Sequence, residues 1–220
     1  MNSTTNKKLS DIFTLQGVFK LLLLSVYLFF CYLMFKIMWQ YIYLDTDTAF
    51  LRIKQTYVPM LHYRLAFFIH VFSSMLALPA GFTQFSKYIR RKMPDVHRVS
   101  GWIYASVVVL VAGPSGFIIG IYANGGWCSQ IAFCMLGFLW VLFTILAIFS
   151  IRKKKVKEHQ KWMIRSFALA MSAITLRGWK YVLVYLFQPR PMDVYMIVAW
   201  LGWVLNLIIA EIIIYKYIKR

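Results

Sequence analysis

The chain has 220 residues, of which 61% are hydrophobic and only 15% are charged, and its formal net charge is +18. A typical soluble domain is about 45–50% apolar and about 25% charged, so this composition excludes an ordinary soluble protein. The apolar residues form blocks long enough to cross a bilayer, which takes about 20 residues in a helix. We therefore expect one transmembrane domain over residues 15–220, preceded by a polar cytoplasmic tail over residues 1–14.

Six apolar blocks are predicted to be transmembrane helices. The first is longer than the apolar core of a signal peptide, which has about 7–15 residues, so we interpret it as a retained helix. A chain crossing lipid must form helices or a closed barrel. Barrel strands alternate apolar and polar residues, and the leucine and isoleucine runs here do not. The predicted fold is thus all-α, a polytopic membrane helix bundle. The blocks cover residues 17–43, 64–89, 101–122, 127–151, 162–187 and 194–217.

Basic residues in the connections predict the orientation. Only Arg52, Lys54, Arg64 and Arg190 lie in the connections of one side. The short connections of cytoplasmic sides are rich in Lys and Arg, so both termini are expected in the cytoplasm. We interpret this charge as a topology signal and an attraction to anionic lipid, rather than as a nucleic-acid surface. The residues of the basic side are Lys7, Lys8, Lys87, Arg90, Arg91, Lys92, Arg98, Arg152, Lys153, Lys154, Lys155, Lys157, Lys161, Arg165, Lys216, Lys219 and Arg220.

Ionisable residues inside the predicted spans are candidate functional residues, because such groups usually face a bundle interior or an aqueous cavity. His70 lies six residues into the second block, and Arg177 lies about ten residues from the outer end of the fifth. We expect these two side chains to share a site in the outer half of the membrane. Lys180 lies about one turn nearer the outer end, and Glu211 requires either a partner or a proton.

His97 and His159 are the candidate haem ligands, because membrane b-type haem is commonly held by two imidazoles on different helices. Both are expected at the cytoplasmic face, with Arg98 and Arg165 close enough to meet haem propionates. The alternative is that these His and Arg side chains only bind lipid headgroups. The sequence has no His-x-x-x-His spacing for zinc and no nucleophile elbow of a hydrolase. Its three cysteines imply no disulfide framework.

Several motifs follow one another in an order that resembles a known family. In chain order they are Gly-Phe-Thr-Gln-Phe at 81–85, His-Arg-Val-Ser-Gly-Trp-Ile-Tyr at 97–104, Gly125-Gly126, Trp140, His-Gln-Lys-Trp-Met-Ile-Arg-Ser-Phe-Ala-Leu at 159–169, and Leu176-Arg177. Together they resemble a bacterial family of predicted multi-pass membrane proteins with a domain of unknown function. The resemblance covers about residues 64–177. Trp102 departs from the pattern, since the family often has a basic residue there.

The resemblance implies a helix bundle in the bacterial inner membrane, with no established activity. The family's layout is loosely similar to that of b-type cytochromes and of small proteins linked to respiratory oxidases. Two classes of function therefore stay open. One is a redox-linked subunit or assembly factor that binds haem or quinone. The other is a non-catalytic accessory subunit that binds partner helices and anionic lipid. The sequence gives no reason to expect an enzyme. The positions that the resemblance singles out are His97, Arg98, Gly101, His159, Trp162, Arg165 and Arg177.

Overall fold

The computed structural model describes residues 15–219, and the regular secondary structure of this part of the chain is entirely helical. This confirms the predicted all-α membrane bundle, while the predicted tail over residues 1–14 lies outside the described residues. The helices are α2 (Leu15–Trp39), α3 (Leu61–Thr83), α4 (Lys87–Lys92), α5 (Pro94–Ser106), α6 (Gly113–Ile121), α7 (Gly126–Arg152), α8 (Val156–Ala170), α9 (Ser172–Phe187) and α10 (Pro191–Ile214), with the 3-10 helix η1 (Ala49–Lys54) and the π-helices η2 (Val107–Ala112) and η3 (Tyr215–Lys219).

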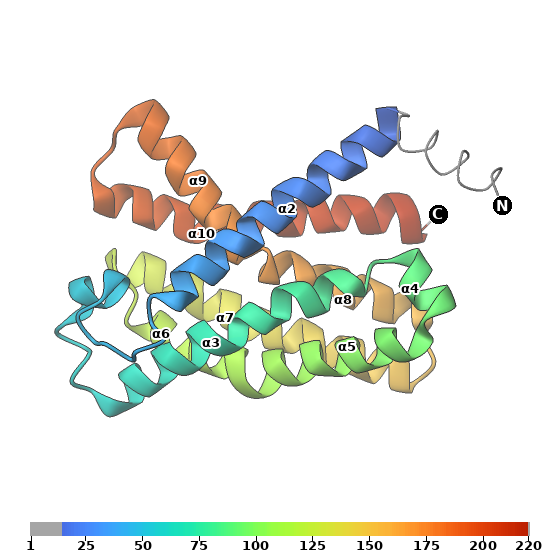
Figure 1. The fold of residues 1–220 in the computed structure, drawn as a ribbon, viewed down its shortest axis with the longest axis horizontal. Helices are drawn as coiled ribbons and strands as arrows, with labels where there is room; N and C mark the ends of the chain where they lie inside the picture. The colour runs from blue at the N-terminus through green and yellow to red at the C-terminus, as the bar shows by residue number, and fades with distance from the viewer. Residues whose placement is uncertain (1–14, 220) are drawn as a thin grey trace.

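Five helical segments are each long and apolar enough to cross a membrane, and the α8–α9 pair is a sixth candidate although it bends by 43°. Figure 1 shows that α2 begins, α7 ends and α10 ends at one end of the molecule, whereas the α9–α10 turn lies at the other end. The α8–α9 pair therefore carries the chain once from end to end. The five segments are Gly17–Trp39, Leu61–Thr83, Pro94–Ile121, Gly126–Arg152 and Pro191–Ile218.

The fifth predicted span is not one straight helix, because the chain breaks at Met171 between α8 and α9. The hydroxyl of Thr175 donates to the Gly202 carbonyl of α10 at 2.5 Å and shares this proton with the Met171 carbonyl at 3.1 Å. A hydroxyl bonded to the carbonyl four residues back tends to bend a helix. Asn206 of α10 donates to the Ala168 carbonyl and to the Thr175 hydroxyl, both at 3.0 Å. Because carbonyls in the last turn of a helix need outside partners, Asn206 stabilises the bend from α10.

The third predicted span contains the π-helical segment η2 directly before Gly113 and Pro114. Proline has no backbone N–H to give to the preceding turn, and π segments inside α-helices frequently lie at functional sites. A Cβ on Gly113 would lie 2.5 Å from the Val108 carbonyl oxygen and would overlap Val141 of α7. Helices α6 and α7 therefore pack closely at Gly113.

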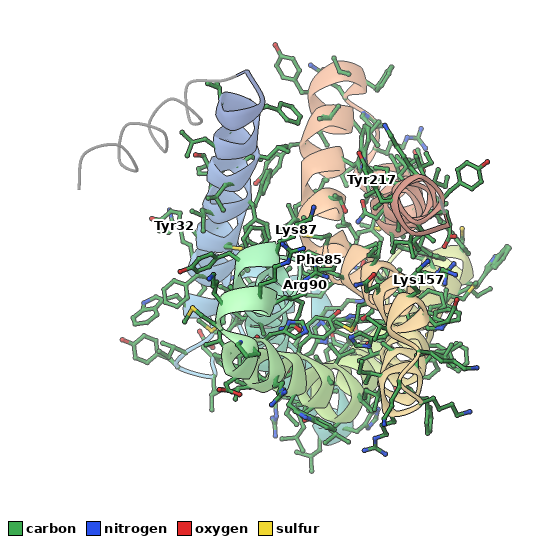
Figure 2. The ribbon with its side chains drawn as sticks, turned by 90° about the vertical axis from the view of Figure 1, so that its right-hand side faces the viewer. Tyr32, Phe85, Lys87, Arg90, Lys157 and Tyr217 are labelled. Carbon is green, nitrogen blue, oxygen red and sulfur yellow. The ribbon has the colours of Figure 1, made fainter. Side chains whose placement is uncertain are left out.

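The second predicted span, expected to end near residue 89, ends at Thr83. The hydroxyl of Ser86 then accepts a hydrogen bond from the Ile89 backbone N–H at 3.2 Å, which caps the separate short helix α4. We name this end of the molecule, with Lys87 and Arg90 of α4 and Lys157 of α8, the basic end. Figure 2 looks onto it and shows these three side chains on the side that faces the viewer, Lys87 and Arg90 on α4 and Lys157 on α8.

The core has two parts. A central cluster, which includes Val108, Trp140 and Trp203, fills the middle of the bundle. An aromatic cluster around Tyr41 and Phe67 closes the end opposite the basic end. Helix α2 leaves most of its side chains exposed, which suits a helix whose neighbour is lipid.

Candidate functional site

The buried centre of the bundle holds a chain of hydrogen bonds among Tyr104, Trp140, Thr144 and Ser166. Thr144 donates to the Trp140 carbonyl at 2.7 Å, so the 2.7 Å bond between Thr144 and Ser166 is donated by Ser166. The 2.7 Å bond between Tyr104 and Ser166 is then donated by Tyr104, whose oxygen accepts the Trp140 indole N–H at 3.1 Å. Each side-chain donor is used once, and a buried network satisfied in this way holds helices in place.

The sequence motifs meet where α3, α5 and α8 join. A Cβ on Gly81 would lie 2.6 Å from the Phe167 ring and 3.0 Å from the Tyr104 ring. Gln84 is buried, and its side-chain amide donates to the Ser100 hydroxyl at 2.6 Å while its oxygen lies against Gly101. The 81–85, 97–104 and 159–169 segments therefore form one packed junction, at the same end as His97 and His159.

His97 and His159 come from α5 and α8, and their imidazoles interact electrostatically. The Nδ1 atom of His159 lies 2.9 Å from the Ala147 carbonyl oxygen. A carbonyl only accepts, so Nδ1 carries the proton and Nε2 keeps its lone pair. The Nδ1 atom of His97 is buried and has no hydrogen-bond partner among the described residues. Thus the structure brings the two predicted ligands to one end with a ring nitrogen on each that is not bound to protein.

The arginines near these histidines differ in what they contact. Arg165 is bound to Glu211 of α10, 2.5 Å from Nε to Oε1, and lies over the Trp162 ring at 4.5 Å. Arg98 is exposed and lies 3.6 Å from Asp95. Arg90 of α4 acts electrostatically on the His97 imidazole. The sequence identified Arg90 only as one of the basic residues between two predicted spans. Its distance from His97 along the chain does not predict that the two side chains interact.

The two histidines fit a ligand set for haem better than a site for a bare metal ion. Within residues 15–219, no group of three or more His, Cys, Asp or Glu side chains lies together. A structural or catalytic zinc site needs three or four such ligands, whereas haem iron needs two axial ligands from the protein. The His159 Nε2 keeps the lone pair through which an imidazole binds haem iron, whereas the unbonded Nδ1 of His97 is buried.

His70 lies in the other half of the bundle, against the π segment. Its Nδ1 lies 2.8 Å from the Ala112 carbonyl oxygen, so Nδ1 carries the proton here too and Nε2 is an acceptor. The ring fits only because Gly116 faces it, since a Cβ there would lie 2.8 Å from the imidazole. His70 therefore ties α3 to η2 and α6.

Arg177 of α9 is partly buried, and one guanidinium nitrogen donates to the Ala173 carbonyl at 2.6 Å. It also interacts electrostatically with His70 and with Tyr41, the second residue after α2. The ion pairs formed by the described residues do not include Arg177. The structure thus brings the two predicted outer-half residues together, whereas the Lys180 side chain is exposed.

Tyr41 joins this group, although no sequence pattern singled it out. It is 2% exposed, and its hydroxyl oxygen accepts the Phe50 backbone N–H at 3.0 Å. Burial raises the pKa of Tyr41, opposed by the Phe50 N–H and by Arg177. The hydroxyl therefore keeps its proton near neutral pH and can donate it. Its position two residues after the end of α2 carries no sequence signal for this role.

Lys54 is a second residue whose role the sequence did not reveal. It is buried, its Nζ donates to the Tyr122 carbonyl at the end of α6, and the rings of Phe50 and Tyr57 lie 5.8 and 5.1 Å from it. His62 Nε2 lies 2.6 Å from the Tyr122 hydroxyl. The flanking aromatic residues were the available signal, since a cation over aromatic faces is a recurrent pairing.

Comparison with known proteins gives a family and no activity. Residues 67–214 match the DUF2306 family, described as predicted membrane proteins. Neither a curated protein nor a solved structure matches the chain. The match covers more than half of the chain, including both histidine motifs, and it confirms the expected multi-pass family of unknown function. The chain therefore belongs to the DUF2306 family of predicted membrane proteins.

Proposed function

We propose that this protein is a redox-linked component of the bacterial cytoplasmic membrane that binds haem b between His97 and His159. The observation that carries the proposal is that the His97 imidazole on α5 and the His159 imidazole on α8 interact electrostatically at the basic end, while the Nε2 lone pair of His159 has no observed protein partner. Imidazoles on different helices are the usual ligands of membrane b-type haem. When bound, haem b supplies a one-electron redox centre.

The surrounding residues have defined tasks in this proposal. The Ala147 carbonyl holds the His159 ring in the tautomer that leaves Nε2 as a ligand, as outer-shell carbonyls do for metal-bound histidines. Arg90 acts on His97 and is exposed enough to meet a propionate, as is Arg98. Arg165 is held by Glu211, so it supports α8 against α10 rather than reaching a propionate.

The test is the visible absorption spectrum of the full chain purified from haem-replete cells. We expect a b-type spectrum in the wild type and its loss in His97→Ala and His159→Ala. His62→Ala is the matched control, because His62 lies at the opposite end and bonds Tyr122. A colourless wild-type protein would contradict haem binding, and a spectrum retained in both ligand variants would contradict this assignment of ligands.

A second candidate function is supported by the basic end itself. There, Lys87, Arg90 and Lys157 come from two helices and lie on one face (Figure 2). Such a face attracts anionic headgroups by about 1 kcal/mol per basic residue near the surface. We propose that an accessory subunit binding anionic lipid, and partner helices along the exposed side of α2, is the alternative. Substituting Lys87 and Lys157 with Gln should lower retention of anionic lipid through purification without changing retention of zwitterionic lipid.

We also propose that the basic end faces the cytoplasm and that both termini lie there, because positively charged connections stay on that side. A reporter that is active only outside the cytoplasmic membrane, fused to the C-terminus, should give no signal. The same reporter inserted in the α9–α10 turn, at the opposite end in Figure 1, should be active. Activity at the C-terminus would reverse the orientation.

A further inference from the structure

A group of hydrogen-bond donors in the outer half of the bundle has no carboxylate among its observed partners. Arg177 uses one guanidinium nitrogen on the Ala173 carbonyl, and the ion pairs of residues 15–219 leave it out. A cation in a membrane interior is costly and normally faces a partner or a cavity. The backbone carbonyl that Arg177 binds supplies no compensating charge.

The neighbours of Arg177 add further donors. Tyr41 accepts the Phe50 N–H through its oxygen, which leaves its own proton to donate. Trp203 of α10 is 4% exposed, and its indole N–H has no partner among the described residues. Its neighbour Gly202 lies against α9, because a Cβ there would be 2.8 Å from Leu176 Cβ, and Leu176 directly precedes Arg177. Arg177 and Trp203 therefore belong to one region between α9 and α10.

On the α3 side of this region, too, a buried polar group has no hydrogen-bond partner. Ser73 lies three residues after His70, and thus on the same helix face, and its buried hydroxyl has no partner within the described part of the chain. His70 itself has an acceptor at Nε2, because its Nδ1 proton is used on the Ala112 carbonyl. Buried polar groups are nearly always hydrogen-bonded, so the unbonded Ser73 hydroxyl and Trp203 N–H indicate missing partners in this part of the bundle.

We propose that Arg177, Tyr41, Trp203 and His70 form a binding site in the outer half of the membrane for a lipid-soluble ligand whose head carries oxygen acceptors. The donors outnumber the acceptors, and one donor is permanently charged, which selects carbonyl or oxyanion oxygen over an amine or a cation. Helix α2 contacts α9 and leaves most of its apolar side chains exposed, which suits a hydrophobic tail lying along it. Two sources supply this chemistry at this depth: a membrane quinone and a long-chain carboxylate.

The inference is independent of haem at His97 and His159, which lie at the basic end. The experiment uses the full chain in nanodiscs, with tritium-labelled decyl-ubiquinone and with labelled palmitate, each measured against empty nanodiscs. We expect saturable binding of at least one probe. Arg177→Met should weaken it about 10-fold or more, since a hydrogen bond to a charged group contributes about 1.5–3 kcal/mol. Trp203→Phe should weaken it by up to about 10-fold.

Two neighbouring residues provide matched controls. Lys180→Met removes an exposed cation one turn away on α9, and Trp200→Phe removes an indole whose N–H already bonds the Cys128 sulfur at 3.3 Å. Neither should change binding by more than about 2-fold, which is within the spread expected for residues without a direct contact. Trp203→Phe keeps the ring and carries the test if Arg177→Met does not fold.

The outcomes separate the two sources from each other and from a site filled by water. Binding of quinone alone that depends on Arg177 assigns a quinone, and binding of palmitate alone assigns a carboxylate. If each probe displaces the other, the site accepts both a quinone carbonyl and a carboxylate. No saturable binding of either probe, or binding unchanged in both Arg177→Met and Trp203→Phe, overturns the proposal, because bridging waters then satisfy these donors.

Discussion

The Arg165 guanidinium on α8 binds the Glu211 carboxylate on α10 through two hydrogen bonds, 2.5 Å from Nε and 3.0 Å from Nη2. Both residues lie inside predicted spans, where an unpaired charge is costly. The fork of arginine matches the two oxygens of a carboxylate, so the pair also fixes the relative position of the two helices. The sequence left the partner of Glu211 open, and the structure shows that Arg165 is one of its partners.

The pair can be tested by a double-mutant cycle with Arg165→Met, Glu211→Met and the double variant. We expect each single variant to lower the thermal midpoint in detergent, and a coupling free energy of about 1 kcal/mol, discounted because the Glu211 side chain is 52% exposed. Additive single effects would mean that the contact contributes nothing to stability.

Gly113 should tolerate no side chain. A methyl group there would lie 2.5 Å from the Val108 carbonyl oxygen and overlap Val141, and overpacking costs about 1–3 kcal/mol. Gly113→Ala should therefore lower the midpoint of thermal unfolding. The control is Gly178→Ala on α9, where nothing lies within 4 Å of the new Cβ and alanine favours the helix. Equal midpoints for the two variants would refute the packing of α6 on α7.

Tyr104→Phe should destabilise the protein by about 1–3 kcal/mol, because it leaves the Trp140 indole N–H without an acceptor and Ser166 without a donor. Tyr181→Phe removes a hydroxyl from a side chain that is 73% exposed and serves as the control. Denaturant unfolding of both variants measures the difference. A stability of Tyr104→Phe equal to that of the control would show that water replaces the lost hydroxyl.

Lys54 should make stability depend on pH in the alkaline range. Burial lowers its pKa from 10.5 to about 8. Between these values the unfolded chain holds the proton and the folded chain releases it, so folded stability rises with pH and is lost as pH falls through about 8. The wild type should therefore gain thermal stability relative to Lys54→Met from about pH 8 to about pH 9.5.

The matched control for this pH series is Lys180→Met, which removes an exposed lysine and should run parallel to the wild type. A Lys54→Met curve parallel to the wild type over the same range would show that Lys54 keeps an ordinary pKa in the folded protein.

Much of the fold was predictable because hydrophobic length is a local property of the chain. The apolar blocks correctly located five spans and the region of the sixth. For α7 the predicted and observed ends differ by only one residue at each end. The second span was predicted too long, since Ser86 starts a new helix by capping it. The bend at Met171 was missed because Thr175 and Asn206, which stabilise it, lie on different helices.

The sequence predicted which residues are candidates for a functional site, but it predicted less well which of them lie next to one another. An ionisable side chain inside an apolar block is visible in the sequence, which singled out His70 and Arg177. The approach of Tyr41 to Arg177, and of Arg90 to His97, depends on the rotation and tilt of separate helices. In lipid both faces of a helix are apolar, so hydrophobic periodicity does not specify that rotation.

By itself, the sequence determined that this chain is a helical membrane protein, which residues are charged at the basic end, and where the polar residues interrupt the spans. These properties follow from the transfer of each segment from water to lipid, which sums along the chain. Only the tertiary structure decided that Glu211 binds Arg165, that Lys54 is buried, and that Trp203 lies with an unbonded N–H in the core. Those relationships arise from side chains of different helices that meet in space, and the order of residues along the chain does not specify which helices are adjacent.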